Sequence, residues 1–114
     1  MTMPSKDRIS LARACYQAYE NDDRAAIERL IADDFAFWSP YDDGIDRATY
    51  FARCWPNHET TAAFEFKRLQ EFGDEVLVTY EAERTDGTWF RNTEVLTFAG
   101  DQVRLVEVYF GWNL

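Results

Sequence analysis

Residues 90–98 read Phe-Arg-Asn-Thr-Glu-Val-Leu-Thr-Phe, and the interpretation of the whole chain starts from this stretch. Side chains of a β-strand alternate between two faces. The face of Glu94 also carries Phe90, Asn92, Leu96 and Phe98. That face is mostly apolar, yet a carboxylate stands at its centre. Because a buried carboxylate must be hydrogen-bonded, paired with a cation or kept neutral, Glu94 is the first candidate for a functional residue.

Similar period-two patterns flank this strand on both sides. The strands that we expect cover residues 61–72, 75–84, 88–98 and 102–112. Each neighbouring pair is separated by a Gly-Asp or Asp-Gly dipeptide, which is typical of hairpin turns. The second half of the chain is therefore predicted to form a four-strand antiparallel meander.

The first half of the chain shows the spacing of helices instead. The expected N-terminal caps of three helices are Ser5, the Asn-Asp-Asp run at 21–23, and Asp46. A short strand at 35–38 and a loop with Pro40 and Gly44 should separate the last two helices, and Pro56 should end the third. Helices followed by a meander predict an α+β fold with the helices on one face of the sheet.

The even-numbered positions of the four strands are mostly apolar, so we expect them to face the helices. They include Phe64, Phe66, Phe72, Val76, Val78, Tyr80, Ala82, Val106, Val108, Phe110 and Trp112. Pairing even with even residues requires a bulged loop. Glu94 would then lie opposite Val78 and Val106, and desolvation would raise its pKa.

Two alternatives stay open for Glu94. With two-residue turns it would face Glu107, Asn92 would face Tyr109, and the two carboxylates would share a proton. In the bulged register Arg104 could instead neutralise Glu94, which would lower its pKa.

Length and charge restrict the classes of function. The 114 residues are typical of one domain, which we take as 1–114, and 12 Lys and Arg against 21 Asp and Glu give a net charge of −9. That balance argues against nucleic acid as a partner. We find no apolar run for a membrane span and no signal-peptide core. Two cysteines, Cys15 and Cys54, are expected as buried thiols of a cytoplasmic protein.

The order of elements and four short stretches resemble the NTF2-like superfamily, and its SnoaL-like branch in particular. The stretches are Ala-Asp-Asp-Phe (32–35), the Trp-Ser-Pro loop (38–40, with Gly44), Asn-Thr-Glu-Val-Leu-Thr-Phe (92–98) and Val-Glu-Val-Tyr-Phe-Gly (106–111). The resemblance implies a cone-shaped α+β barrel in which the curved meander and a short extra strand wrap the three helices around a pocket. It also implies a homodimer through the outer sheet face.

Ketosteroid isomerases, which are similar here, offer a comparison by position. Glu94 falls where they carry the protonated acid of their oxyanion hole. Ser39 falls where they carry the general-base Asp, and Cys15, with Tyr16 beside it, falls where their first helix carries a Tyr. The resemblance thus transfers one of three catalytic roles directly.

Two further positions bear on the reaction. Asp42 or Asp43 could replace the missing general base a few residues later in the loop. Limonene epoxide hydrolases carry a carboxylate on the inner face of the last strand, where this chain has Val106, Val108 and Phe110. That difference argues against epoxide hydrolysis.

The candidate site combines these positions. The catalytic candidates are Glu94, Asp42 and His58, and His58 would join Glu94 if its loop folds over the pocket mouth. The ligand-binding candidates are Tyr16, Trp38, Tyr41, Trp55, Tyr80, Asn92, Val106, Val108, Phe110 and Trp112. A single histidine without partners at ligand spacing indicates no metal site, and no cofactor is expected.

Two functions of different classes follow. In the first, the pocket binds a small apolar, cyclic or aromatic molecule, and Glu94 assists proton transfer next to a carbonyl in an isomerisation, cyclisation or dehydration. In the second, the protein is a non-catalytic binding or interaction module, and Glu94 is structural. A strip on the outer face, Val103, Leu105, Glu107 and Tyr109, is the expected contact with a second copy.

Overall fold

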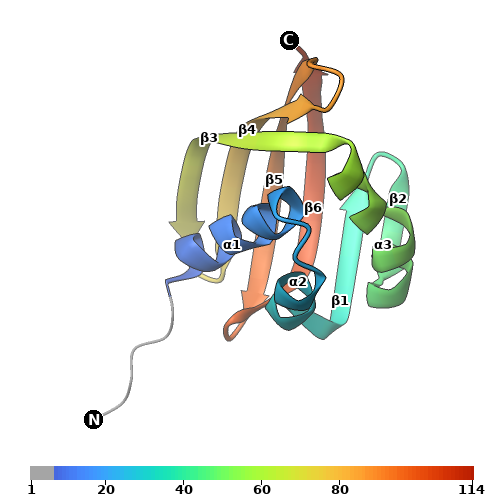
Figure 1. Cartoon of the computed structure of the whole chain (residues 1–114). Coiled ribbons are helices and arrows are strands. Elements are labelled where there is room, and N and C mark those ends of the chain that lie inside the picture. The colour runs from blue at the N-terminus through green and yellow to red at the C-terminus, as the bar shows by residue number, and fades with distance from the viewer. Residues whose placement is uncertain (1–6) are drawn as a thin grey trace.

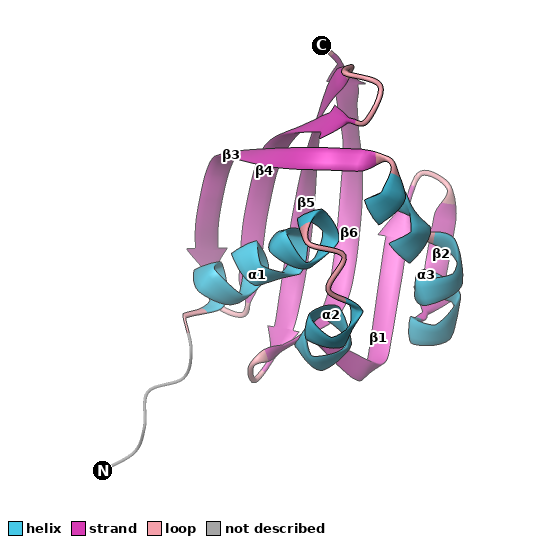
Figure 2. Ribbon diagram, viewed as in Figure 1, coloured by secondary structure: helices cyan, strands magenta, loops and turns pink. Residues whose placement is uncertain are grey.

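The computed structural model describes residues 7–114. Within that range, the helices are α1 (Arg8–Glu20), α2 (Arg24–Leu30), α3 (Arg47–Arg53) and a 3₁₀ helix (Trp55–Glu59). The strands there are β1 (Ile31–Ser39), β2 (Asp42–Asp46), β3 (Thr61–Phe72), β4 (Glu75–Arg84), β5 (Trp89–Ala99) and β6 (Gln102–Asn113). Helices α1 and α2 lie across one side of the sheet, and α3 lies beside β1 and β2 (Figures 1 and 2).

Aspartate side chains cap the three α-helices of this range. Asp23 accepts a hydrogen bond from Ala26 N at the start of α2, and Asp46 accepts one from Thr49 N at the start of α3. Both caps confirm the sequence prediction. The cap of α1 is Asp7, and the predicted cap Ser5 lies outside the described residues.

The sheet has the strand order β2-β1-β6-β5-β4-β3 in the described range, with β1 parallel to β6. It is therefore a six-stranded mixed sheet rather than a meander with one short strand. Strands β2 and β3 lie at opposite edges and do not pair, so the predicted barrel is not closed. β1 also begins at Ile31, four residues earlier than expected.

Strand β2 forms within the segment that we predicted as a loop. It pairs with β1 in antiparallel register, with Phe37 opposite Ile45. Gly44 makes this hairpin possible, because its φ is +65° and a Cβ there would lie 2.7 Å from the Trp38 ring. The left-handed conformation and the close approach both favour glycine.

The predicted register holds around Glu94. Val78 lies opposite Glu94 across β4 and β5, and on the other side Glu94 pairs with Val108. The predicted neighbour Val106 is wrong, because it pairs with Leu96. Glu107 lies opposite Val95, which excludes the register with two facing carboxylates.

A two-residue turn and a bulge together produce this register. Ala99 pairs with Gln102 across the turn, as the rejected alternative would require. The register then shifts between Thr97 and Phe98, which leaves Arg104 as the extra residue of β6. Val103, which precedes the shift, is 1% exposed opposite Phe98, so its predicted place on the outer face is wrong.

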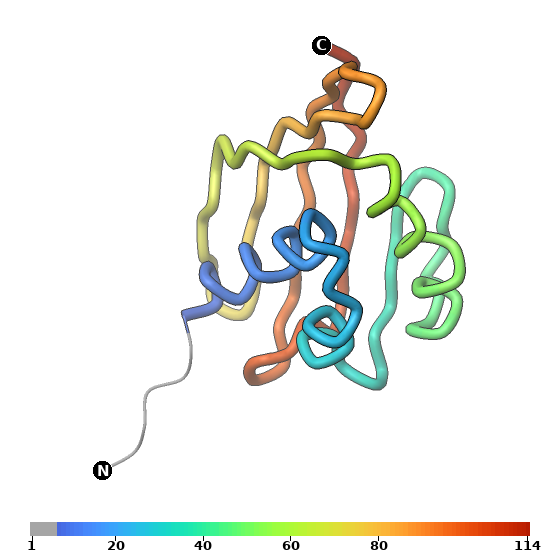
Figure 3. The backbone as a smooth tube through the Cα atoms, in the orientation of Figure 1, coloured from blue at the N-terminus to red at the C-terminus, as the bar shows by residue number. Residues whose placement is uncertain are grey.

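Two more bulges move side chains between faces. Lys67 is the extra residue of β3, where the register shifts between Phe66 and Arg68. Strand β3 bends sharply along its length (Figure 3). Phe72, beyond this bulge, pairs with Glu75 and is 57% exposed, so its predicted inward position is wrong.

The third bulge lies at Gly111 of β6. Asn92 pairs with Phe110 and Arg91 pairs with Trp112, which leaves Gly111 unpaired between them. A Cβ at Gly111 would lie 2.0 Å from the Arg91 carbonyl oxygen. The bulge turns Trp112 toward the face of Arg91, whose guanidinium lies 5.5 Å from the Trp112 ring centre.

Candidate functional site

A cavity of about 450 Å³ lies between the helices and the inner face of the sheet. Residues from every helix and every strand of the described range line it. Aromatic residues supply much of its wall, including Tyr16, Tyr19, Phe35, Tyr50, Phe64 and Phe90. Pockets that hold small organic molecules span roughly 300–1,000 Å³ and are mostly apolar with a few polar groups, so this cavity has the size of a ligand site.

Glu94 lies on the cavity wall within a chain of hydrogen bonds. The Tyr80 hydroxyl donates to Glu94 Oε2 over 2.6 Å, and Asn92 Nδ2 lies 3.3 Å from the Tyr80 oxygen as its donor. Asn92 Oδ1 in turn accepts from Gly111 N over 3.1 Å. The bulge of β6 thereby holds Asn92, Asn92 orients Tyr80, and Tyr80 holds one carboxylate oxygen of Glu94.

Burial raises the pKa of Glu94 above its ordinary value of 4.5, although the hydrogen bond from Tyr80 and the nearby Tyr16 hydroxyl oppose the shift. Among the described residues, no cationic side chain lies within 4.0 Å of this carboxylate, and the predicted alternative partner Arg104 is exposed. Neutral donors stabilise an ionised carboxylate less than a cation does. Glu94 is therefore biased toward its protonated form.

Tyr16 brings a second hydroxyl to the same wall. The side chain is 6% exposed, and its oxygen is buried without a hydrogen-bond partner among the described residues. It lies close enough to lower the pKa of Glu94, but its geometry falls outside that of an ordinary hydrogen bond. Burial and then the charge of Glu94 raise the pKa of Tyr16. An unsatisfied buried hydroxyl beside a cavity is ready to donate to a ligand.

Asp42 also lines the cavity, and two neighbours hold it. Its Oδ1 lies 2.9 Å from Arg53 Nη2, in an ion pair that lacks the alignment of a hydrogen bond. Its Oδ2 accepts from the Ser39 hydroxyl over 2.8 Å. Ser39 has no carboxylate of its own, but its hydroxyl positions the carboxylate of Asp42.

The remaining predicted residues divide into two groups. Those that line the cavity are Tyr41, Val106, Val108 and Phe110, together with the residues described above. Those that do not are Trp38, Trp55, His58 and Trp112. Trp38 pairs with Glu107 on the outer face, and Trp112 follows the Gly111 bulge.

His58 and Trp55 lie in the 3₁₀ helix that follows α3. His58 Nδ1 is 3.4 Å from Asp22, and its ring lies 4.8 Å from the Trp55 ring. Trp55 packs in the core against Tyr19, with ring centres 4.8 Å apart. The structure does not bring His58 to the cavity wall, so the expected approach to Glu94 is absent.

Several lining residues were missed in the sequence. Tyr19 and Tyr50 share a hydrogen bond between their hydroxyls on the cavity wall. The spacing of Tyr19, three residues after Tyr16 on one helix face, was the available signal. The free thiols of Cys15 and Cys54 also line the cavity, and burial raises their pKa to about 12 and about 11.

No helix among residues 7–114 is long and apolar enough to cross a membrane. The same range holds no group of three or more His, Cys, Asp or Glu side chains arranged for a metal ion.

Comparison with known proteins places the chain in a family. Among solved structures, a candidate ketosteroid isomerase from Kribbella flavida has 16% identity and a TM-score of 0.79 over 94% of this chain and 79% of that one. An LEH-like epoxide hydrolase of M. tuberculosis has 17% identity and a TM-score of 0.78 over 94% and 84%. An NTF-2 like protein from Burkholderia xenovorans LB400 has 22% identity and a TM-score of 0.76 over 94% and 85%.

The TM-scores establish a shared NTF2-like fold. The low sequence identities leave the reaction open. No curated protein sequence matches the chain. The family model of the SnoaL-like domain matches residues 12–107, which is most of the sequence. The chain therefore belongs to the SnoaL-like family.

Proposed function

We propose that the cavity binds a small cyclic or aromatic molecule and that the protein moves a proton next to a carbonyl group of that molecule. The observation that carries this proposal is that Glu94 and Tyr16 both line a largely apolar cavity, and that the Tyr16 hydroxyl has no hydrogen-bond partner among the described residues. A protonated carboxyl and a phenol of raised pKa are both hydrogen-bond donors. Two donors aimed at one oxygen stabilise the negative charge that develops there as a neighbouring C–H bond breaks.

Asp42 is the carboxylate that would take the proton. The C–H electron pair moves into the enolate, Asp42 receives the proton, and Glu94 and Tyr16 donate hydrogen bonds to the enolate oxygen. Return of the proton to a different carbon completes an isomerisation. Arg53 and Ser39 hold the Asp42 carboxylate in its orientation in this scheme.

Hydrogen–deuterium exchange of trans-2-decalone in D₂O, followed by ¹H NMR, tests the proposal. Wild-type protein should accelerate exchange at the carbons beside the carbonyl, and Glu94→Gln and Asp42→Asn should each reduce the acceleration by about tenfold or more. The matched control is Glu81→Gln, which removes a carboxylate of β4 that does not line the cavity. Exchange at the buffer rate, with the ketone shown to be bound, would exclude the proton-transfer role.

The second candidate is a binding module without chemistry, and one observation favours it. The chain from Gly111 through Asn92 and Tyr80 to Glu94 ties β6, β5 and β4 together. A carboxyl in such a network can be purely structural. Ligand binding that is unchanged in Glu94→Gln, without exchange activity, would select this candidate.

We also propose that the protein is a cytoplasmic homodimer, with a second copy on the outer sheet face. Tyr109 and Trp112 are 57% and 60% exposed there, and exposed aromatic side chains are enriched at interfaces. Sedimentation velocity should give a dimer for the wild type and a monomer for Tyr109→Arg. A wild-type monomer at micromolar concentration would exclude this assembly.

A further inference from the structure

The charged side chains on the cavity wall differ in their partners. Four side chains of ordinarily charged type line it among the described residues: Asp42, Arg53, Arg84 and Glu94. Asp42 and Arg53 neutralise one another across 2.9 Å. Glu94 is held by the neutral Tyr80. Arg84 therefore remains as a cation that no carboxylate of the cavity contacts within 4.0 Å.

Neutral acceptors hold the Arg84 guanidinium in place. Nη1 lies 3.2 Å from Thr88 Oγ1, and Nη2 lies 3.3 Å from Asn113 Oδ1. The group also lies over the Phe90 ring, 4.4 Å from its centre. No carboxylate of the described residues approaches it within 4.0 Å. Arginine binds anions through a rigid fork of donors, and here that fork lacks a charged partner.

The neighbouring acid in the sequence is engaged elsewhere. Asp86 accepts hydrogen bonds from Thr88 N over 2.9 Å and from Thr88 Oγ1 over 2.6 Å. These two bonds are the main reason that the pKa of Asp86 is lowered, and Arg84 contributes less. The Thr88 hydroxyl thus links Asp86 to the guanidinium, and the two side chains form no direct ion pair within 4.0 Å.

Arg84 and Glu94 line the cavity at different positions along the strands. Arg84 is the last residue of β4, beside the end of β6 (Figure 1). It follows Tyr80 by four residues, so their Cα atoms are roughly 13 Å apart along the strand. The phenyl rings of Phe64 and Phe90 line the cavity too, each within 6.3 Å of the Tyr80 ring.

We infer that the ligand of this cavity is a small organic acid: its anionic group pairs with Arg84, and its apolar ring extends toward Glu94. The inference deepens the proposed function and depends on the cavity being occupied. A carboxylate or sulfonate satisfies the guanidinium fork, and the aromatic wall between Arg84 and Tyr80 accepts a flat hydrocarbon. A neutral molecule of the same shape would leave Arg84 without its charged partner.

Two fluorescent dyes that differ by one sulfonate test this inference. They are 8-anilinonaphthalene-1-sulfonate and its neutral parent, N-phenyl-1-naphthylamine. Arg84→Gln should weaken sulfonate binding about tenfold or more, which is the range of a charge-assisted hydrogen bond, and should change binding of the neutral dye less than about twofold. Arg84→Lys should fall between. Arg104→Gln, which removes an exposed arginine outside the cavity, is the matched control.

The outcomes distinguish binding of an organic acid at Arg84 from binding of any ligand in the cavity. Equal effects of Arg84→Gln on both dyes, or no effect on either, would overturn the assignment of an acid. Unchanged binding of the neutral parent shows that the variant is folded. Val108→Phe, which fills the cavity, should weaken both dyes. If it weakens neither, the dyes bind elsewhere and the proposed function itself loses its support.

Discussion

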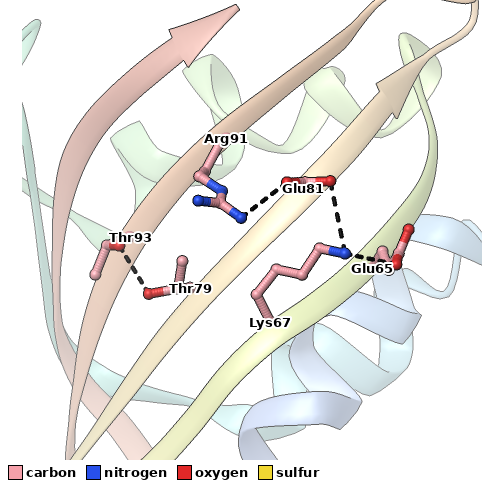
Figure 4. A network of polar contacts seen from close by, with 6 residues as sticks. All are labelled: Glu65, Lys67, Thr79, Glu81, Arg91 and Thr93. Atoms are coloured by element: carbon pink, nitrogen blue, oxygen red, sulfur yellow. Dashed lines mark hydrogen bonds and ion pairs between the residues drawn. The ribbon is translucent and has the colours of Figure 1, made fainter. Parts of the chain in front are cut away.

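Strands β4 and β5 carry one polar network on each face of the sheet. The carboxylate in each network has a different kind of partner. On the outer face, Glu81 lies between Arg91, at 2.9 Å, and Lys67, at 3.7 Å (Figure 4). On the inner face, Glu94 has the neutral Tyr80 as its hydrogen-bond donor, at 2.6 Å. Tyr80 directly precedes Glu81 in the sequence, so the environment changes within one residue.

The two faces of the sheet therefore satisfy their carboxylates with different kinds of partner. Cations satisfy the outer carboxylate, and the hydroxyls of Thr79 and Thr93 bond to each other over 2.9 Å. Among residues 7–114 the inner carboxylate has no such cation; it lies on the wall of a cavity and has a raised pKa. Groups with this imbalance between desolvation and charge pairing cluster at ligand sites.

The largest effect is expected at the bulge that divides the faces. Gly111→Ala should lower the free energy of unfolding by about 2–4 kcal/mol, because its Cβ would meet the Arg91 carbonyl oxygen at 2.0 Å and backbone would have to move. Urea denaturation measures this loss. Gly100→Ala is the control: its φ is +61° but its Cβ would meet open space, so about 1 kcal/mol is expected. Equal losses would show that the close approach does not constrain β6.

The next effect compares one hydroxyl on each face. Tyr80→Phe should cost about 1–3 kcal/mol, because it leaves Glu94 without its donor and Asn92 without its acceptor. Thr79→Val on the outer face removes a single bond to Thr93, so about 1 kcal/mol or less is expected. A larger loss in the outer variant, measured by denaturation, would reverse the comparison.

The raised pKa of Glu94 predicts that the stability of the protein depends on pH. Because the pKa of Glu94 is raised in the folded state, the unfolded chain ionises first as the pH rises above 4.5. The wild type therefore loses stability from that pH up to the folded pKa, by about 1.4 kcal/mol for each pKa unit. Glu94→Gln lacks this loss and should gain stability relative to the wild type over the same interval. A difference that stays constant from pH 4 to pH 8 would contradict the assignment.

The smallest effect is expected for Glu81→Gln. This variant removes the partner of Arg91 and Lys67 on a partly exposed face, and such pairs contribute below about 1 kcal/mol. Added salt should shrink the difference further, because it screens the ion pair. A loss above 2 kcal/mol in thermal or urea denaturation would make the outer network the main polar contributor of the sheet.

The sequence contained the pattern around Glu94 but not the bulges. Alternation placed Glu94 opposite Val78 correctly, since one face of β5 is apolar. Phe72, Val103 and Trp112 changed faces at extra residues, and a bulge is decided by how two distant strands fit rather than by local pattern.

Tertiary contacts also decided the rest of the site. Strand β2 has no strand pattern of its own and forms by pairing with β1. Among the described residues, the Tyr16 hydroxyl has no hydrogen-bond partner and the Arg84 guanidinium has no carboxylate partner. Both features can be recognised only when helix and sheet are placed together. His58 had the right chemistry for a site, but the 3₁₀ helix holds it against Trp55.

The most direct measurement is a ¹³C NMR titration of the Glu94 side-chain carboxyl in the folded protein, assigned by comparison with Glu94→Gln. We expect an apparent pKa above 4.5, and a further rise in Tyr80→Phe, because the Tyr80 hydrogen bond lowers the pKa of Glu94. A value at or below 4.5 would mean that Glu94 is an ordinary ionised carboxylate, and the proposal of a proton-donating acid beside the cavity would be wrong.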